Sequence, residues 1–283
     1  MKKILVAGAS GRLGQLIVRQ LKHQGYWVRA LVRMEKKWEQ LRIPVDDAVQ
    51  ADVSVRQSLQ TCCQDIDAVI SCAGASMDLK NLSDRSTFTS VDLHGNTNLL
   101  TASRDAGVKK FVYVSAAGSE LLQHIEYSRS HYQFEQTLAA SGIRFSVIKP
   151  TGFFYFLGEI LAMAKKGRGL LIGNGEHTTN PIHEQDVAEA CCAALTNDAG
   201  EMIIGGPEVF SRRGIVDLAF QVAGKQPHII TIPPKVFSAL TYPSTLVNPR
   251  IHALLAFGGA VSEMDIVGPK YGKRRLQEYF QSL

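Results

Sequence analysis

Residues 3–14 read Lys3-Ile-Leu-Val-Ala-Gly8-Ala-Ser-Gly11-Arg-Leu-Gly14, and this stretch decides the fold. An apolar run is followed by glycines spaced three residues apart, and the amphipathic pattern of residues 13–24 comes next. A strand that enters a helix through a glycine turn presents the first N–H groups of the helix to a phosphate. The run from Ile4 to Ala9 is short for the core of a secretion signal, so we expect a buried strand and no leader.

The composition is that of an ordinary globular protein, since 45% of the 283 residues are hydrophobic and 20% are charged. The net charge of +5 is spread along the chain, so we expect no nucleic-acid partner. No apolar run approaches the roughly 18 residues that span a bilayer, so we expect no membrane partner. The five cysteines lack the spacing of a zinc or redox site and predict reduced thiols in a cytoplasmic protein without a metal. A monomer or a homodimer is expected.

The first half of the chain alternates between short β-branched runs and helical patterns. Strands are expected at 3–7, 27–32, 48–50, 68–71, 111–115 and 145–148, and helices at 13–24, 88–105 and 127–140, with a further helix capped by Ser54. This alternation predicts an α/β protein with a doubly wound parallel sheet, which is a Rossmann fold.

The alternation of strands and helices stops after Pro150 and resumes with an expected helix at 184–195 and an expected strand at 202–204. We therefore predict a dinucleotide-binding core at 1–152, completed by 178–204. Residues 153–177 and 205–283 are expected to form a smaller C-terminal lobe for a substrate or partner. Within it, Phe153, Phe154, Tyr155 and Phe156 are consecutive, so some of these rings should line an apolar pocket while the others join the core.

The glycine turn predicts a dinucleotide site that includes Gly8, Ser10, Gly11, Arg12, Leu13 and Gly14. One glycine permits the tight reversal, another lets the pyrophosphate approach the backbone, and a third lets the helix lie close to the strand. The second expected strand ends at Val32-Arg33 without an acid for a ribose 2′-hydroxyl. Arg12 and Arg33 suit a 2′-phosphate, so NADP(H) is favoured over NAD(H). The alternative is that both arginines are merely exposed to solvent.

Several motifs resemble the short-chain dehydrogenase/reductase superfamily over residues 1 to about 200. They are the glycine spacing, Asp52-Val53, Ser71-Cys72-Ala73-Gly74 and Tyr113-Val114-Ser115. Three finer stretches resemble its atypical, NmrA-like branch: Val91-Asp92 through Gly95-Asn96, residues 106–112, and Lys149-Pro150-Thr151-Gly152-Phe153-Phe154.

The resemblance also implies where the cofactor lies. It places Asp52 and Val53 at the adenine, and Ala73 and Gly74 at the adenosine ribose, with the preceding Cys72 counted in the same site. It places Pro150, Thr151, Gly152 and Phe153 along the nicotinamide. It further gives His183 and Asp186 a structural role at the start of the helix that follows them.

In that superfamily a Ser orients the substrate oxygen, and a Tyr exchanges the proton that accompanies hydride transfer. A Lys four residues after the Tyr holds the ribose and lowers the pKa of the Tyr. Ser115 and Tyr127 match in position, but the fourth residue after Tyr127 is His131. The two share one helix face, although histidine is shorter than lysine and largely neutral at pH 7. The expected catalytic residues are therefore Ser115, Tyr127 and His131, in an altered site.

These observations predict an NADP(H)-binding protein of the short-chain dehydrogenase/reductase type. The first hypothesis is an oxidoreductase or isomerase that acts on a small carbonyl or alcohol substrate. The alternatives are a non-catalytic NADP(H) sensor that regulates a protein partner, and an assembly factor of the NmrA-like type. Ser115 and Tyr127 favour the enzyme, whereas His131 favours the alternatives.

Overall fold

A seven-stranded parallel sheet forms the centre of the computed structural model, which describes residues 1–198 and 200–283 apart from the side chains of residues 35–37. The strand order is β3-β2-β1-β4-β5-β6-β9, so the chain winds outward from β1 in both directions. This is the doubly wound order of a dinucleotide-binding sheet, and it confirms the predicted Rossmann fold. The strands are β1 (Lys3–Ala7), β2 (Trp27–Val32), β3 (Asp47–Gln50), β4 (Ala68–Ser71), β5 (Lys110–Val114), β6 (Arg144–Pro150) and β9 (Gly200–Ile204).

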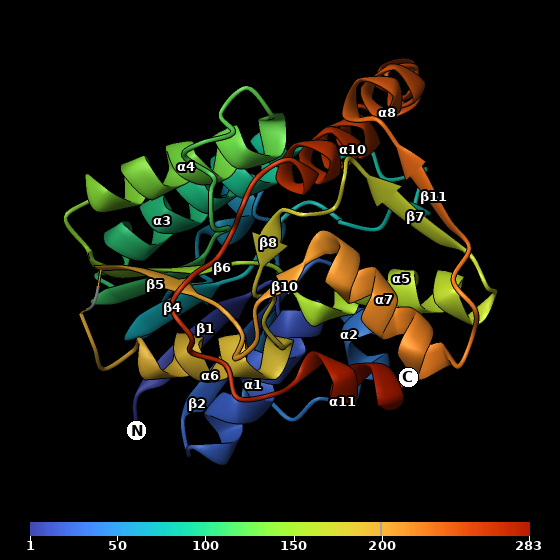
Figure 1. The fold of residues 1–283 in the computed structure, drawn as a ribbon. Coiled ribbons are helices and arrows are strands. Elements are labelled where there is room, and N and C mark those ends of the chain that lie inside the picture. Colours follow the sequence, from blue (N-terminus) through green and yellow to red (C-terminus); the bar gives the residue numbers. More distant parts are fainter. Residues whose placement is uncertain (199) are drawn as a thin grey trace.

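Helices cover both faces of this sheet (Figure 1). On one face α1 (Arg12–His23) lies against α6 (Glu184–Ala193), and α1 buries the apolar stripe that its sequence predicts, including Ile17 and Leu21. On the other face lie α3 (Asn96–Asp105) and α4 (Glu126–Ala139), which bury Leu99, Leu100, Phe134 and Leu138. The short α2 (Glu35–Gln40) follows β2. Two separate apolar cores therefore lie above and below the strands.

A third apolar core lies beside the sheet and joins segments that are distant in sequence. It is built by α5 (Phe154–Lys165), α7 (Arg212–Ala223) and the C-terminal α11 (Leu276–Gln281), which contact one another (Figure 1). Two small sheets border this core: β7 (Gly169–Ile172) pairs with β11 (Ile229–Ile232), and β8 (Thr178–Thr179) pairs with β10 (Phe210–Ser211).

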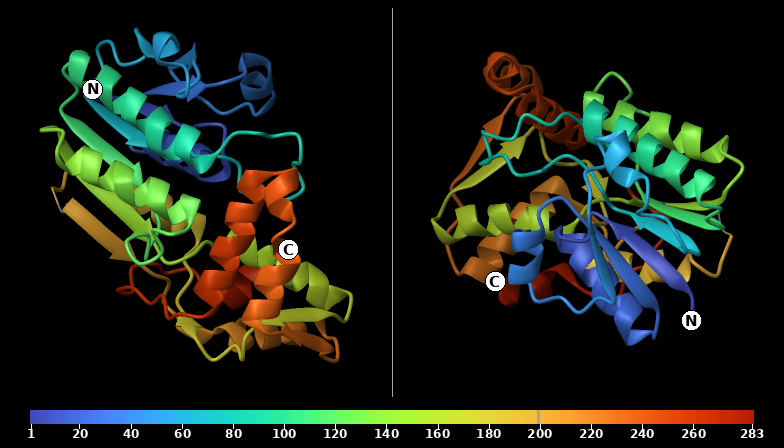
Figure 2. Two further views of the ribbon diagram at one scale, coloured as in Figure 1. Left: turned by 90° about the horizontal axis from the view of Figure 1, so that it is seen from above. Right: turned by 180° about the vertical axis from the view of Figure 1, so that it is seen from behind.

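A group of three helices, α8 (Pro234–Thr241), α9 (Ser244–Val247) and α10 (Pro249–Ser262), stands beside the loop of residues 75–87 (Figure 2). The side chain of Arg250 joins the two, because it is fully buried and donates to the carbonyl oxygens of Ser76, Asp78 and Asn81. Neither α8 nor α9 buries a residue, and apolar side chains such as Leu240 and Leu246 are exposed there. Among the described residues, no helix is long and apolar enough to cross a bilayer.

Two local predictions are wrong in detail. Ser54 does not cap a helix; Asp52 Oδ1 instead accepts hydrogen bonds from the N–H and hydroxyl groups of Ser54 at 2.9 and 2.7 Å. The following turn η1 (Arg56–Leu59) is a 3₁₀ helix. The helix expected at 88–105 opens with a π-helical turn, η2 (Thr89–Gly95), before α3. There the Asn96 side chain donates to the carbonyl oxygen of Asp92 at 2.9 Å, at the point where the wide turn becomes an α-helix.

We predict that Arg250→Met lowers the free energy of unfolding by about 2–4 kcal/mol, because three carbonyl groups lose a buried charged donor. Urea denaturation of the whole chain measures this change. Lys235→Met removes an exposed cation from α8 and serves as the control, with an expected change within about 0.5 kcal/mol. Equal stability of Arg250→Met and wild type would show that the guanidinium does not hold the loop.

Candidate functional site

The glycine turn between β1 and α1 has the geometry that its spacing predicts. Gly8 has a φ of +80°, and a Cβ there would lie 2.7 Å from the carbonyl oxygen of Cys72. A Cβ on Gly14 would lie 2.1 Å from the carbonyl oxygen of Gly8, so this position admits only glycine. The Gly11 N–H donates to the same Gly8 oxygen at 2.9 Å. The chain thus reverses tightly and brings the helix against the strand.

The start of α1 leaves backbone donors for a ligand. Its N-cap is Gly11, which has no side chain to accept from the first-turn N–H groups. Ser10, Gly11 and Arg12 are exposed, while Leu13 is half-buried and anchors the turn to the core. An exposed helix N-terminus without a side-chain cap fits a dinucleotide pyrophosphate, because the backbone donors and the helix dipole both favour negative charge.

The other expected cofactor residues lie at the carboxyl ends of β2, β3 and β4, next to the turn in the strand order. Val53 is buried and lies against Gly95, where a Cβ would fall 2.7 Å from its Cγ2 atom. The Cys72 thiol donates to the carbonyl oxygen of Ala7 at 3.3 Å, and burial raises its pKa to about 12. Ala73 is half-buried and Gly74 is exposed. One edge of the sheet therefore gathers the residues predicted for the adenosine half.

Both candidate arginines are exposed at this edge. The Arg12 guanidinium lies 5.5 Å from the ring centre of Tyr155 on α5, which ties the glycine turn to the aromatic run. Arg33 follows the last residue of β2, and its carbonyl oxygen accepts from Gln50 Nε2 at 3.3 Å. Within the described residues neither guanidinium forms an ion pair, so both remain available to a phosphate.

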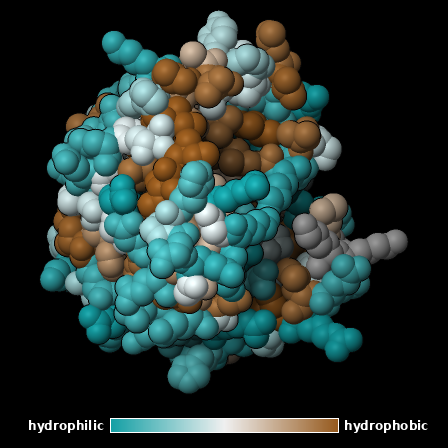
Figure 3. Space-filling view, turned by 45° about the vertical axis from the view of Figure 1, so that its right-hand side comes forward, coloured by the Kyte–Doolittle hydropathy of each residue, from teal (hydrophilic) through white to brown (hydrophobic). Residues whose placement is uncertain are grey.

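A cavity of about 280 Å³ adjoins the carboxyl ends of β5 and β6. Six residues predicted for the nicotinamide and for catalysis line it together: Ser115, Tyr127, Pro150, Thr151, Gly152 and Phe153. The remaining wall comes chiefly from loop 75–87, residues 116–117, α5, β8, the start of α7 and α10, and its side chains are mostly apolar. Apolar side chains gather around a hollow at the height of α8 and α10 in Figure 3.

The aromatic run divides as its spacing predicts. Phe153 and Phe156 line the cavity, whereas Phe154 is 1% exposed and belongs to the third core. Tyr155 stacks on Phe153 with ring centres 5.7 Å apart. The cavity wall is thus continuous with the aromatic contact of Arg12.

Tyr127 lies among aromatic rings, and within the described residues no cation contributes to its pKa. Its ring centre is 5.1 Å from that of Phe88, 4.6 Å from that of His131 and 4.4 Å from that of Phe257. Burial, followed by the negative charge of Asp92, raises the pKa of Tyr127 above its usual value. The phenol is therefore held in its protonated form, unlike a tyrosine beside a lysine.

Both ring nitrogens of His131 face buried groups. Nδ1 lies 2.6 Å from the Tyr113 hydroxyl, and Nε2 lies 3.5 Å from Asp92 Oδ1. Burial lowers the pKa of His131 to about 4 and raises that of Asp92 to about 8. The imidazole is therefore neutral at pH 7 and packs against the Tyr127 ring, and its catalytic role stays a prediction.

The Ser115 hydroxyl is also engaged. It donates to Glu135 Oε1, and Glu135 Oε2 lies 2.8 Å from the Lys149 ammonium, which also contacts Glu201 at 2.7 Å. The Ser115 oxygen therefore reaches the cavity as an acceptor, while its proton is directed away. No motif in the sequence marks Glu135, although this residue continues the four-residue spacing of Tyr127 and His131 on α4.

His183 and Asp186 have the structural role that the resemblance implies. His183 Nδ1 accepts from the Gln185 N–H at 3.0 Å and caps α6. The buried Asp186 carboxylate accepts from the Lys273 N–H at 3.0 Å and pairs with the Arg274 guanidinium, so it holds the C-terminal segment.

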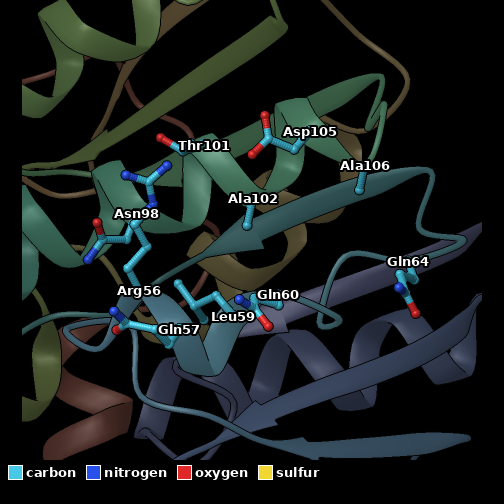
Figure 4. Close-up of a pocket in the computed structure, with 10 residues that line it drawn as sticks. All are labelled: Arg56, Gln57, Leu59, Gln60, Gln64, Asn98, Thr101, Ala102, Asp105 and Ala106. Carbon is cyan, nitrogen blue, oxygen red and sulfur yellow. The ribbon is translucent and has the colours of Figure 1, made fainter.

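A second hollow, of about 600 Å³, lies between η1 and α3 (Figure 4). Polar side chains from both elements line it, among them Arg56, Asn98 and Asp105. None of the predicted cofactor or catalytic residues belongs to it, whereas six of them line the apolar cavity.

The fold matches solved structures of nucleotide-dependent enzymes. A nucleoside-diphosphate-sugar epimerase from Staphylococcus aureus gives a TM-score of 0.78 at 16% identity, over 99% of this chain and 100% of that chain. The NADPH-dependent quinone oxidoreductase QOR2 of Escherichia coli, in complex with NADPH, gives 0.72 at 18% identity, over 99% of each chain. At these identities the likeness shows the fold alone.

Two kinds of relative are similar in sequence. The photosystem II assembly factor Ycf39 of Trieres chinensis is 28% identical over 234 residues, which are 81% of this chain and 72% of that protein. The chloroplastic divinyl chlorophyllide a 8-vinyl-reductase of Cucumis sativus is 27% identical over an alignment of 322 positions, which covers 98% of this chain and 75% of that protein.

A family model described as NAD(P)H-binding matches residues 8–198, which is more than half of the chain. The match starts at the first glycine of the turn and extends past α6, so it spans the elements that build the cofactor edge of the sheet. Sequence, topology and turn geometry agree on one conclusion: the chain belongs to the NAD(P)H-binding family.

Proposed function

We propose that this protein is an NADP(H)-dependent oxidoreductase that reduces a small, apolar carbonyl or conjugated substrate. The observation that carries the proposal is the 280 Å³ cavity, because it is walled on one side by Pro150 to Phe153 and contains Ser115 and Tyr127. An apolar cavity with a few polar groups is typical of a small-molecule site. The vinyl-reductase name of one sequence relative agrees with this choice.

Bound NADPH supplies the hydride, and the residues of this chain supply position and the proton. The glycine turn and the start of α1 hold the pyrophosphate, while Arg12 and Arg33 bind the 2′-phosphate. Pro150 to Phe153 place the nicotinamide against the cavity, whose apolar wall excludes water from the reacting atoms. Tyr127 donates the proton that completes the reduction.

The direction of reaction follows from the state of Tyr127. To oxidise an alcohol, the residue must act as a base, which requires the phenolate. Burial disfavours the phenolate, and the lysine that would stabilise it is replaced by the neutral His131. The protonated phenol is the resting form that reduction requires, so we propose reduction as the direction of the reaction.

A second candidate function is a non-catalytic NADP(H)-binding assembly factor or regulator. Two observations favour it: the Ser115 proton is committed to Glu135, and exposed apolar side chains on α8 and α9 could meet a protein partner. The assembly-factor name of one relative agrees with it. For either function we propose a cytoplasmic location, on the basis of the five free cysteines.

We predict that NADPH binds about tenfold or more tightly than NADH, since a charged hydrogen-bonded pair is worth that much. Arg33→Ala should remove most of the difference by weakening NADPH and leaving NADH unchanged. Isothermal titration of the whole chain measures both affinities. Arg19→Ala, which removes an exposed arginine from the far end of α1, is the control and should retain the preference. Equal affinities of the wild type for the two cofactors would refute the NADP(H) assignment.

We predict that Tyr127→Phe lowers the kcat of NADPH oxidation by about a hundredfold or more, because it removes the proton donor. The assay uses a panel of small quinones and enones, and NADPH affinity should be unchanged. Tyr132→Phe, on the same helix but outside the cavity, is the control. Because the raised pKa keeps the phenol protonated, the wild-type rate should not fall between about pH 7 and about pH 9.

The two functions give different results in this assay. Turnover that is unchanged in Tyr127→Phe would contradict its role as the donor. Tight NADPH binding without turnover of any acceptor in the panel would favour the assembly factor or regulator.

A further inference from the structure

Two buried polar groups at the substrate cavity have no partner within the described residues. They are Thr179 Oγ1 and Arg212 Nε. Both residues line the cavity, and Thr179 is 2% exposed. An unsatisfied donor in an apolar cavity costs free energy unless a ligand or another polar group pairs with it. The wall formed by Thr179 and Arg212 therefore holds hydrogen-bonding capacity that the described residues do not use, and a small side-chain rotation would present it to a ligand in the cavity.

The two groups come from one small structural unit. Thr179 in β8 pairs with Phe210 in β10, and the Arg212 N–H donates to the carbonyl oxygen of His177 just before β8. Arg212 opens α7 immediately after β10. This ladder fixes the backbone beneath both side chains, so their approach does not depend on a mobile loop.

The guanidinium of Arg212 is held by a single hydrogen bond. Nη2 donates at 2.8 Å to the carbonyl oxygen of Val261 in the last turn of α10, where the helix dipole stabilises a cation. Burial nevertheless lowers the pKa of Arg212 to about 10, so it remains charged at pH 7. It is the one charged side chain among the described residues that line the cavity.

Asp265 is the acid whose negative charge acts on this guanidinium, and it favours the cationic form of Arg212. Its carboxylate is already engaged, since Oδ1 accepts from the N–H and hydroxyl groups of Thr178 at 2.5 and 3.0 Å. It makes no ion pair with Arg212 within the described part of the chain, and it is largely exposed. The cavity side of the guanidinium is thus left without an anion.

We propose that Arg212 and Thr179 bind a carboxylate, so that the substrate is a small apolar acid held with its anionic group at this end of the cavity. A guanidinium matches a carboxylate with two parallel N–H donors, and the Thr179 hydroxyl adds a third. The apolar walls take the hydrocarbon part of the molecule. A volume of about 280 Å³ suits one or two fused rings. The inference rests on the proposed function only in treating this cavity as the substrate site.

The test compares 2-naphthoate with 2-naphthamide, which has nearly the same shape but no charge. Calorimetric titration of the full chain is done with saturating NADPH, so that the glycine turn is not open to the anion. We expect the wild type to bind 2-naphthoate about tenfold or more tightly than the amide. Arg212→Gln should abolish this difference. Arg213→Gln, which removes the neighbouring exposed arginine that pairs with Asp217, should preserve it.

A second variant keeps the test decisive if Arg212→Gln does not fold. Thr179→Val preserves the shape of the side chain and should weaken 2-naphthoate about threefold to tenfold without changing the amide. Circular dichroism identifies which variants are folded. Equal affinity of the wild type for acid and amide, or an unchanged preference in folded Arg212→Gln or Thr179→Val, would overturn the proposal.

Failure of this inference and failure of the proposed function give different results. Charge-selective binding without turnover of any acceptor, acids included, would retain the carboxylate site and refute the reductase. Turnover of neutral quinones together with no preference for 2-naphthoate would retain the reductase and refute the carboxylate site.

Discussion

The close approach of α1 to β1 is the contact on which the rest of the site depends. Only the absence of side chains at Gly8 and Gly14 allows the helix to start so near the strand. This places the first-turn N–H groups at the carboxyl edge of the sheet, between the residues that follow β2 and those that follow β4. Phosphate recognition through backbone donors needs this geometry more than it needs any particular side chain, which is why the turn alone cannot distinguish an enzyme from a sensor.

Burial determines the charges around the cavity. His131 and Asp92 are both driven toward their neutral forms, and Tyr127 is kept as a phenol. Two further charged groups lie near the cavity: Lys149 is paired with Glu135 behind Ser115, and the half-buried Arg212 forms no ion pair within the described residues. At rest this distribution leaves a protonated phenol and a guanidinium at the cavity, which is the state that the proposed reduction and the proposed carboxylate site both require.

The sequence predicts the sheet, the glycine turn and the division of the aromatic run, because these depend on local spacing and apolar period. The Ser54 cap is wrong because Asp52, two residues earlier, binds the Ser54 hydroxyl. The environment of the His131 ring is set by Tyr113 and Asp92. Both lie on other elements, so the sequence around His131 does not predict these contacts. Arg212 and Arg213 are equivalent in the sequence, and only the contact of Arg212 with the Val261 carbonyl of α10, which lies 49 positions away, distinguishes them.

Arg250 ties loop 75–87 to α10, so we expect the loop and this helix to lose their ordered structure together. Its guanidinium reaches back 174 positions along the chain, and the loop carbonyls cannot open to water without losing it. Met77 and Leu79 of this loop form part of the cavity wall. A ligand in the cavity therefore lies against the loop that Arg250 ties to α10, the helix that contacts α8 and α9. Catalysis in the cavity and partner binding at α8 and α9 are therefore compatible in the same fold, because Arg250 connects the two regions.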